Sequence, residues 1–217
     1  MSLTPEKKAR YYRYAANTTT VTRNVLGVVV AANALSGDRL LPHVLRHRSV
    51  GCSVLVAAIG GLDKLDGFFA CKSHTHGMPI TAKDSAFDSN MDKKNNKVLG
   101  YSFTARNIVD GIAMRNQRML MHAGVMAGYA IWTNDRDARM ADSRANAAIG
   151  ADTKAIGPNK WKTFAQNAGH SLEASPLSVI VPEVAEATYL TSCVLGEIGL
   201  KKADKVHQTP VLTEMVA

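Results

Sequence analysis

The sequence predicts an all-α protein, and three observations support this fold class. Apolar residues recur with helical spacing through most of the chain, whereas the strict alternation typical of β-strands is scarce. Turn-forming residues such as Ser36-Gly37-Asp38 separate the helical stretches. No internal repeat is visible in the 217 residues, and a chain of this length is expected to form a single domain over 1–217.

The composition is that of a folded, basic protein. Apolar residues make up 46% of the chain and charged residues 20%, which excludes a disordered or low-complexity protein. Lysine and arginine number 26 against 18 acidic residues, and the net charge of +8 favours anionic partners such as nucleic acid, acidic lipid or phosphorylated metabolites. Cys52, Cys71 and Cys193 are far apart, so they indicate neither a disulfide framework nor a zinc site, and a reducing compartment is expected.

Hydropathy alone favours a soluble protein. The N-terminal residues do not predict a secretory signal, the mean hydropathy is −0.08, and no clean apolar run of about 18 residues is present. Several shorter apolar blocks are rich in Gly, Ala, Ser and Thr, residues that also line tightly packed membrane helices. These blocks are Val25–Leu35, Gly51–Leu62, Met119–Trp132, Leu177–Pro182 and Ala187–Leu195. Buried helices of a soluble protein and packed membrane helices both stay open at this point.

The first half of the chain predicts two helices after a basic amphipathic piece that ends near Tyr14. The first helix follows the capping residues Thr18–Thr20, covers about Val21 to Leu35 and stops at the turn that comes next. A basic loop leads to the second helix, from about Val50 to Cys71, which begins apolar and becomes acidic.

The second half predicts further helices separated by polar segments. A loop over Lys72–Pro79 is followed by a polar helix over Thr81–Lys97 and by apolar helices over Val98–Met114 and Met119–Trp132. A charged stretch over Asn134–Lys154 and a basic patch around Lys160 and Lys162 come next. The chain ends with apolar helices from about Leu172 to Leu200 and a polar tail.

Five acidic residues have the spacing of a cation site. Asp63 and Asp66 are three residues apart, and Asp84, Asp88 and Asp92 are spaced by four, so each set shares one face of a helix. Like charges one turn apart destabilise an isolated helix, so a bound cation would compensate them. A solvated acidic face without a ligand is the alternative interpretation.

Magnesium or manganese is the cation that this chemistry favours. Both are hard divalent ions that take carboxylate oxygens and leave positions open for substrate phosphates. Gly67, directly after the second acid, removes a side chain where a bulky ligand could approach the helix.

The acidic segment resembles the motif of the CDP-alcohol phosphatidyltransferase family. Members carry D-x-x-D-G-x-x-A-R followed by G-x-x-x-D-x-x-x-D, and this chain has Asp63, Asp66, Gly67 and Ala70 in the first half, with Cys71 at the arginine position.

Two registers are open for the second half of the motif. Asp84 with Asp88 preserves the family's spacing, whereas Asp88 with Asp92 needs four extra loop residues and puts Asp84 at the glycine position. We favour the second register because it aligns Thr81 with a threonine of many members. It also gives the Asp92-Lys93 ending that is common in the phosphatidylglycerophosphate synthase branch.

A second match lies downstream. Phosphatidylglycerophosphate synthases commonly show G-K-x-K-T-x-x-Q, and the chain keeps Lys160, Lys162, Thr163 and Gln166 of this block. Two further similarities are weaker. Ile112–Asn116, which includes Arg115, resembles a family segment that reads I-A-R-E. Asn17–Thr20 with Arg23 resembles the N-x-x-T-x-x-R opening of the family's first helix.

The resemblance implies a transfer of the phosphatidyl group from CDP-diacylglycerol to an alcohol, with release of CMP. Divalent ions held by Asp63, Asp66 and Asp88 would neutralise the diphosphate, and Asp92 would accept the proton of the attacking hydroxyl. In the other register the roles of Asp88 and Asp92 pass to Asp84 and Asp88.

The acceptor expected from the resemblance is glycerol 3-phosphate. Lys160 and Lys162, with Arg115 as a weaker candidate, would hold its phosphate, and Gly67 and Ala70 belong to the substrate-binding part of the motif. The resemblance also implies a polytopic membrane helix bundle of about six helices, an integral-membrane location in contact with membrane lipid, and compatibility with a homodimer.

A soluble helical binding protein with an acidic surface cluster is the rival hypothesis. Nucleic-acid binding is not expected, although Lys8, Arg10 and Arg13 alternate with tyrosines near the N-terminus, because no nucleic-acid motif follows. His74 and His76 are expected to be ordinary surface residues.

Overall fold

The computed structural model describes residues 4–78, 82–145 and 157–208. Within these ranges the protein is all-helical and contains no strand, so the predicted all-α class is confirmed. The α-helices are α1 (Pro5–Leu35), α2 (Val50–Thr75), α3 (Ala82–Ala113), α4 (Gln117–Ala145), α5 (Gly157–Glu173), the one-turn α6 (Leu177–Ile180) and α7 (Pro182–Gln208), and a short 3₁₀ helix covers His43–Leu45.

Several predicted helices are parts of longer ones. The basic N-terminal piece and the first predicted helix form the single helix α1, whose cap is Thr4: its side chain accepts a hydrogen bond from the Lys7 amide. Likewise α3 runs through the predicted boundary near Val98, and α4 continues past Trp132 into the charged stretch. A change from polar to apolar residues without glycine or proline does not stop a helix.

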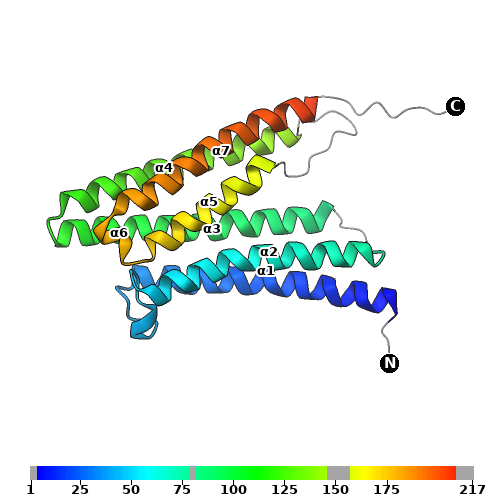
Figure 1. Ribbon diagram of the computed structural model, residues 1–217, viewed down its shortest axis with the longest axis horizontal. Helices are drawn as coiled ribbons and strands as arrows, with labels where there is room; N and C mark the ends of the chain where they lie inside the picture. The colour runs from blue at the N-terminus through cyan, green and yellow to red at the C-terminus, as the bar shows by residue number, and fades with distance from the viewer. Residues whose placement is uncertain (1–3, 79–81, 146–156, 209–217) are drawn as a thin grey trace.

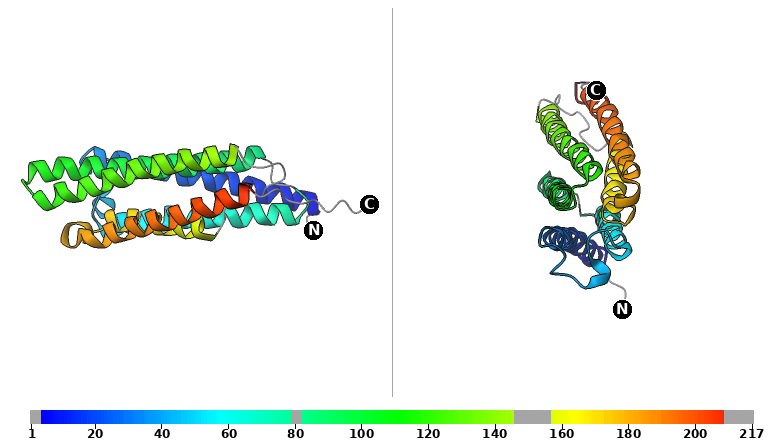
Figure 2. Two further views of the ribbon diagram at one scale, coloured as in Figure 1. Left: turned by 90° about the horizontal axis from the view of Figure 1, so that it is seen from above. Right: turned by 90° about the vertical axis from the view of Figure 1, so that its left-hand side faces the viewer.

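The six long helices lie side by side in two layers. The end-on view in Figure 2 shows α1, α3 and α4 in one layer and α2, α5 and α7 in the other. Each neighbour in the ring α1, α2, α5, α7, α4, α3 packs against the next. Both described chain ends, at the start of α1 and the end of α7, lie at the same end of the bundle, and the α3–α4 turn lies at the opposite end (Figure 1).

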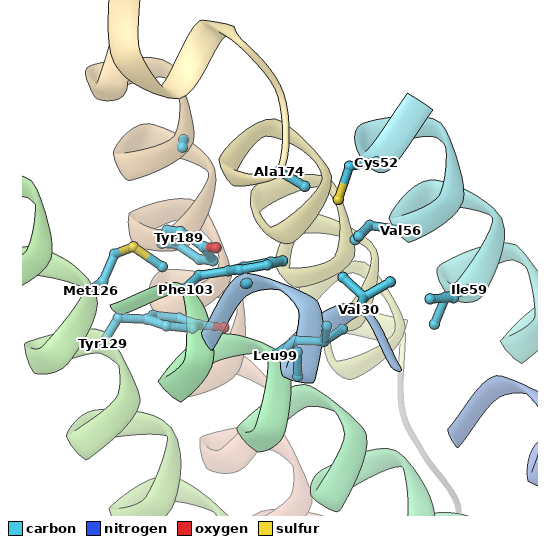
Figure 3. Close-up of a cluster of buried hydrophobic side chains, with 13 residues drawn as sticks. Val30, Cys52, Val56, Ile59, Leu99, Phe103, Met126, Tyr129, Ala174 and Tyr189 are labelled. Carbon is cyan, nitrogen blue, oxygen red and sulfur yellow. The ribbon is translucent and has the colours of Figure 1, made fainter. Parts of the chain in front are cut away.

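The apolar core lies between the layers. Leu99 and Phe103 of α3 meet Val30 of α1 and Val56 of α2 (Figure 3), and Tyr189 of α7 closes the cluster from the other side. The Tyr129 and Tyr189 rings have centroids 4.6 Å apart. This core joins α1, α2, α3, α4 and α7.

The distribution of side chains across the described part of the bundle is unusual. Buried polar and charged side chains are as numerous as buried apolar ones, and many of the latter are alanines. Large apolar side chains are instead widely exposed, for example Val25, Ile112, Met121 and Leu190. Among the helices as far as they are described, none combines the length and the sustained hydropathy that a membrane crossing needs.

Candidate functional site

Two acids of the predicted motif meet the first helix at the centre of the candidate site. An Arg23 guanidinium nitrogen donates to Asp63 Oδ1 at 2.6 Å and lies 3.5 Å from Asp66 Oδ2. The Thr20 hydroxyl donates to Asp66 Oδ2 at 3.0 Å. Thr20 and Arg23 on α1 are three residues apart, as are Asp63 and Asp66 on α2, so each pair lies on one face of its helix. The two faces pack against each other because α1 and α2 are antiparallel.

The cluster is largely shielded from water. The side chains of Arg23, Asp63 and Asp66 are 4%, 18% and 7% exposed. Charge-assisted hydrogen bonds are strong in such surroundings, because little water screens them. Thr20 and Arg23 belong to the N-terminal segment that the sequence singled out only as a weak similarity, and the structure brings both onto the motif acids.

A partly open cavity adjoins the cluster where α1, α2, α3 and α5 meet; its volume of about 230 Å³ includes the space that opens to solvent. Its wall includes Thr163 of the downstream lysine block, so the two motif segments lie on one cavity although they are far apart in the sequence. The lining residues are Arg23, Ile59, Gly60, Asp63, Asn95, Asn96, Thr163 and Asn167.

Glycine allows an amide to enter this region. A Cβ at Gly27 of α1 would overlap the Asn95 side-chain amide of α3. Asn95 is 6% exposed, and its Oδ1 has no hydrogen-bond partner among the described residues. Sequence reasoning missed Gly27 and Asn95, because an isolated glycine in a helical pattern does not show which neighbour approaches it.

Of the remaining motif residues of α2, Gly67 faces away from the cluster, whereas Ala70 lies one turn after Asp66 on the same face of the helix. Gly67 is exposed, and no described atom comes within 4 Å of a Cβ built there. Ala70, almost one turn further on, is half-buried. Gly67 therefore leaves an open surface strip next to the acids.

Lys160 and Lys162 differ in their surroundings. Lys160 is exposed, whereas Lys162 is 7% exposed and its carbonyl oxygen accepts a hydrogen bond from Ser192 at 3.2 Å. Burial lowers the pKa of Lys162 to about 8; the negative charge of Asp137 opposes this shift, and the positive charge of Arg136 adds to it.

The ion pair on α4 near Lys162 was also missed. Arg136 donates to Asp137 at 3.3 Å, and both side chains are buried. The sequence placed these residues in a charged stretch without a role. The helical spacing of Thr133, Arg136, Asp137 and Met140, all of which are buried, is the signal that could have found them.

Arg115 lies far from the acids. It occupies the α3–α4 turn with a φ of 51° and is exposed. From Asn95 to Arg115 the chain covers nearly all of the second half of α3, which at about 1.5 Å per residue is roughly 30 Å. The structure therefore does not bring Arg115 to the cavity.

The acids Asp84, Asp88 and Asp92 belong to α3, but their side chains lie outside the part that the structure describes. Across the described residues there is no group of three or more His, Cys, Asp or Glu side chains with metal-binding geometry. Asp63 and Asp66 supply two carboxylates on one helix face, which fits half of a divalent site, and further carboxylates would have to come from α3.

Fold and site together define a two-layer helical bundle with a buried acid and guanidinium cluster beside a small polar cavity. Comparison with family models, curated proteins and solved structures found no match to this chain.

Proposed function

We propose that the protein is an integral-membrane CDP-alcohol phosphatidyltransferase that transfers the phosphatidyl group of CDP-diacylglycerol to a phosphorylated alcohol, glycerol 3-phosphate, and releases CMP. The observation that carries the proposal is the meeting of three sequence segments at one cavity. Arg23 of the first segment contacts Asp63 of the second, and Thr163 of the third lines the same cavity.

The acids would hold the metal and take the proton. A divalent cation, Mg²⁺ or Mn²⁺, supplies charge neutralisation at the diphosphate when it is bound. Asp63 and Asp66, together with Asp88, would hold it, and Arg23 fixes the orientation of the first two carboxylates. Asp92 would accept the proton of the alcohol as its oxygen attacks the lipid-side phosphorus, whose bond to CMP breaks.

The positions of α1 and α3 residues along the bundle axis support this assignment of the α3 acids. Gly27 of α1 lies against Asn95 of α3, and both helices run in the same direction (Figure 1). Counting back along the two backbones brings residues 92 and 88 level with Arg23 and Thr20. Residue 84 comes about one turn further out. These levels favour the register in which Asp88 and Asp92 work together with Asp63 and Asp66.

The acceptor phosphate would bind near the start of α5. Lys160 is exposed at this end, and Lys162 lies close enough to Lys93 and Arg136 for their charges to act on it. Such a cluster of cations favours an anionic acceptor over a neutral alcohol. Arg115 has no part in this proposal because of its position at the other end of α3.

The distribution of apolar side chains supports a membrane location. Large apolar residues are exposed along the whole bundle, including the half that ends at the α3–α4 turn and α6. They include Val28, Val29, Leu35, Ile108, Val109, Ile112, Met121, Val125, Ile131, Ile180, Leu190 and Val194. The same half buries charged residues such as Glu173 and His122. Apolar residues outside and paired polar residues inside are the arrangement that lipid favours.

The positions of the lysines along the bundle support one orientation of the protein in the membrane. The described lysines all lie on the half that carries the site and the two described chain ends: Lys7, Lys8, Lys64, Lys72, Lys93, Lys94, Lys97, Lys160, Lys162, Lys201, Lys202 and Lys205. The excess of lysine and arginine next to membrane helices lies on the cytoplasmic side. The opposite end carries cations too, Arg39, Arg46, Arg48, Arg115 and Arg118, but fewer than the end that holds the site. We therefore place the site at the cytoplasmic surface, with the first two turns of α5 outside the hydrocarbon layer.

The test is CMP release by the full-length protein in phospholipid vesicles that contain CDP-diacylglycerol and Mg²⁺. We expect release with glycerol 3-phosphate and much less with glycerol, inositol or serine. Asp63→Asn should abolish release, whereas Asp135→Asn, a change of the same chemistry on the exposed face of α4, should leave it unchanged. A protein that is recovered without detergent as a soluble monomer and releases no CMP would contradict the proposal.

A further inference from the structure

A second cavity lies beside the first, closer to the end of the bundle that carries the α3–α4 turn. It is partly open to solvent and is bounded by α3, α4, α5 and α7; its volume of about 320 Å³ includes the space that opens to solvent. Asn96 of α3 lines both cavities. The lining residues are Asn96, Lys97, Gly100, Tyr101, Met126, Tyr129, Ala130, Thr133, Gln166, His170 and Tyr189.

Two buried polar groups on α5 line this cavity. Gln166 and His170 are each 2% exposed and stand one turn apart on the same face of the helix. Among the described residues, neither Gln166 Oε1 nor His170 Nε2 has a hydrogen-bond partner. Unpaired buried polar groups are costly, so a polar atom of a water molecule or of a ligand is expected at this part of the cavity wall.

The histidine can present a donor to that ligand. His170 Nδ1 lies 3.1 Å from the Tyr189 hydroxyl, and when the tyrosine donates this bond, Nε2 carries the hydrogen. The Gln166 amide offers an N–H as well after a half-turn of its last torsion. Both groups then suit an acceptor such as a carbonyl oxygen. Gly100 leaves room beside them, because a Cβ there would lie 3.5 Å from His170 Cε1.

The α4 side of the wall is largely apolar, whereas Asn96 and Lys97 of α3 add polar groups near the first cavity. Met126 and Tyr129 point from α4 toward Tyr189 (Figure 3), and Ala130 of the same helix also lines the cavity. The Tyr129 hydroxyl is within 3.2 Å of Ser192 and is thereby satisfied inside the protein. A narrow apolar chain with one carbonyl near its end matches this combination of surfaces.

We propose that this cavity binds the ester-linked end of one acyl chain of the phospholipid substrate, with the ester carbonyl on His170 and Gln166 and the methylene groups against Met126, Tyr129 and Ala130. The inference rests on the proposed function for the identity of the lipid. In a glycerophospholipid the ester carbonyls lie a few bonds deeper than the phosphate. Gly100 lies one turn, about 5.4 Å, deeper along α3 than Asn96, which borders the first cavity.

The test uses a lipid that cannot react. The full-length protein is placed in vesicles with phosphatidylglycerol that carries a photoactivatable diazirine close to the ester of one acyl chain, and the labelled peptides are identified by mass spectrometry. We expect labelling of residues 126–133 and 166–170. Ala130→Phe should lower this labelling about tenfold, and Gly128→Phe should not, because no described atom lies within 4 Å of a Cβ at Gly128.

A milder variant guards against misfolding. Gly100→Ala makes only an ordinary van der Waals contact with His170, so the protein should fold normally and label severalfold less. Labelling that both cavity variants leave unchanged, or labelling confined to other peptides, would overturn the inference. CMP release is measured in parallel with the same protein preparations, in vesicles that contain CDP-diacylglycerol, Mg²⁺ and glycerol 3-phosphate. Labelling at the cavity without CMP release would support the lipid site and contradict the proposed transferase activity. CMP release without this labelling would support the transferase activity and contradict the lipid site.

Discussion

At the residue scale, the buried triad of Arg23, Asp63 and Asp66 defines the candidate site. Both acids were predicted from their spacing and from the motif. The arginine was named only as a weak similarity, because its pairing depends on how α1 packs against α2. Gly27, Asn95 and Arg136 were not predicted at all. Their roles come from contacts between helices, and a single sequence does not reveal which helices are neighbours.

The two registers of the α3 acids make different predictions. If Asp92 is the general base, Asp92→Asn should lower the rate of CMP release by about 10²–10⁴, the usual contribution of general base catalysis. Asp84→Asn should have a mild effect, because the backbone of residue 84 lies about one turn further out than the cluster. Steady-state rates of the two variants decide between the registers. The reverse ranking would establish the shorter spacing, and equal severe losses would mean that all three acids reach the metals.

Lys162 predicts a pH dependence of acceptor binding. Burial lowers the pKa of this lysine to about 8, so its charge is present at pH 7 and is mostly lost at pH 9. A neutral amine binds phosphate weakly, and the KM for glycerol 3-phosphate should therefore rise up to about tenfold between these pH values. Lys162→Arg should remove most of this rise, because arginine keeps its charge. A KM that changes equally with pH in both proteins would exclude Lys162 from the phosphate site.

The same pKa shift has a consequence for stability. The lysine has a lower pKa in the folded protein than in the unfolded chain, so between about pH 8 and its ordinary pKa of 10.5 the unfolded chain binds the extra proton. Stability contributed by this group therefore increases as the pH rises through that window. Below pH 8 both states are charged, and the burial of the charge opposes folding.

At the element scale, a buried polar network ties α3, α4, α5 and α7 together. Glu173 of α5 accepts from Asn107 of α3 at 2.6 Å and lies 2.6 Å from Nε2 of His122 on α4. The other imidazole nitrogen lies 2.9 Å from Glu186 of α7. Arg48, in the loop before α2, donates to the side-chain oxygen of Asn107. Four helices and a loop thus share one set of hydrogen bonds.

This network predicts a large effect of a small substitution. Glu173→Gln removes the charge from a fully buried side chain and leaves His122 with one carboxylate partner instead of two. Loss of one member of a buried charged network costs about 3–5 kcal/mol, which thermal unfolding of the purified protein would show as a clear decrease in Tm. Glu183→Gln breaks the exposed pair with Arg118 and serves as the control, with no measurable change. Equal Tm values for the two variants would mean that the network does not hold the helices together.

The boundaries of the helices show where sequence reasoning stops. The turn after Leu35 was predicted, because glycine acts locally on the backbone. The loop predicted to begin at Lys72 begins only after Thr75, where α2 ends, and its last residue, Pro79, lies outside the described residues. The predicted breaks at Val98 and Trp132 do not exist, since they rested on composition alone. The arrangement of the helices in two layers also lay beyond the sequence, because it is decided by packing between distant residues.

At the scale of the whole molecule, one end of the bundle holds the acids, Lys160 and Lys162, and the other exposes apolar side chains such as Ile112 and Met121 while it buries Glu173. Large apolar side chains are also exposed at the end that holds the site, among them Phe68 and Trp161. A chain of low mean hydropathy can show this arrangement, because buried polar residues lower the average of each helix without contacting lipid. Which residues could contact lipid therefore depends on the face of the helix on which they lie, and the average hydropathy along the helix predicts it less well.

The central claim is that the buried acids serve a metal-dependent phosphatidyl transfer. The most direct measurement compares CMP release by wild-type protein and by Asp66→Asn in the same vesicles, with CDP-diacylglycerol, glycerol 3-phosphate and Mg²⁺. Asparagine keeps an oxygen that accepts from Thr20, and Arg23 keeps its 2.6 Å bond to Asp63, so the variant should still elute as folded protein in gel filtration although the lost charge lowers its stability. The account predicts that wild-type protein releases CMP and that the variant releases none above background. Release by the folded variant at the wild-type rate would contradict it.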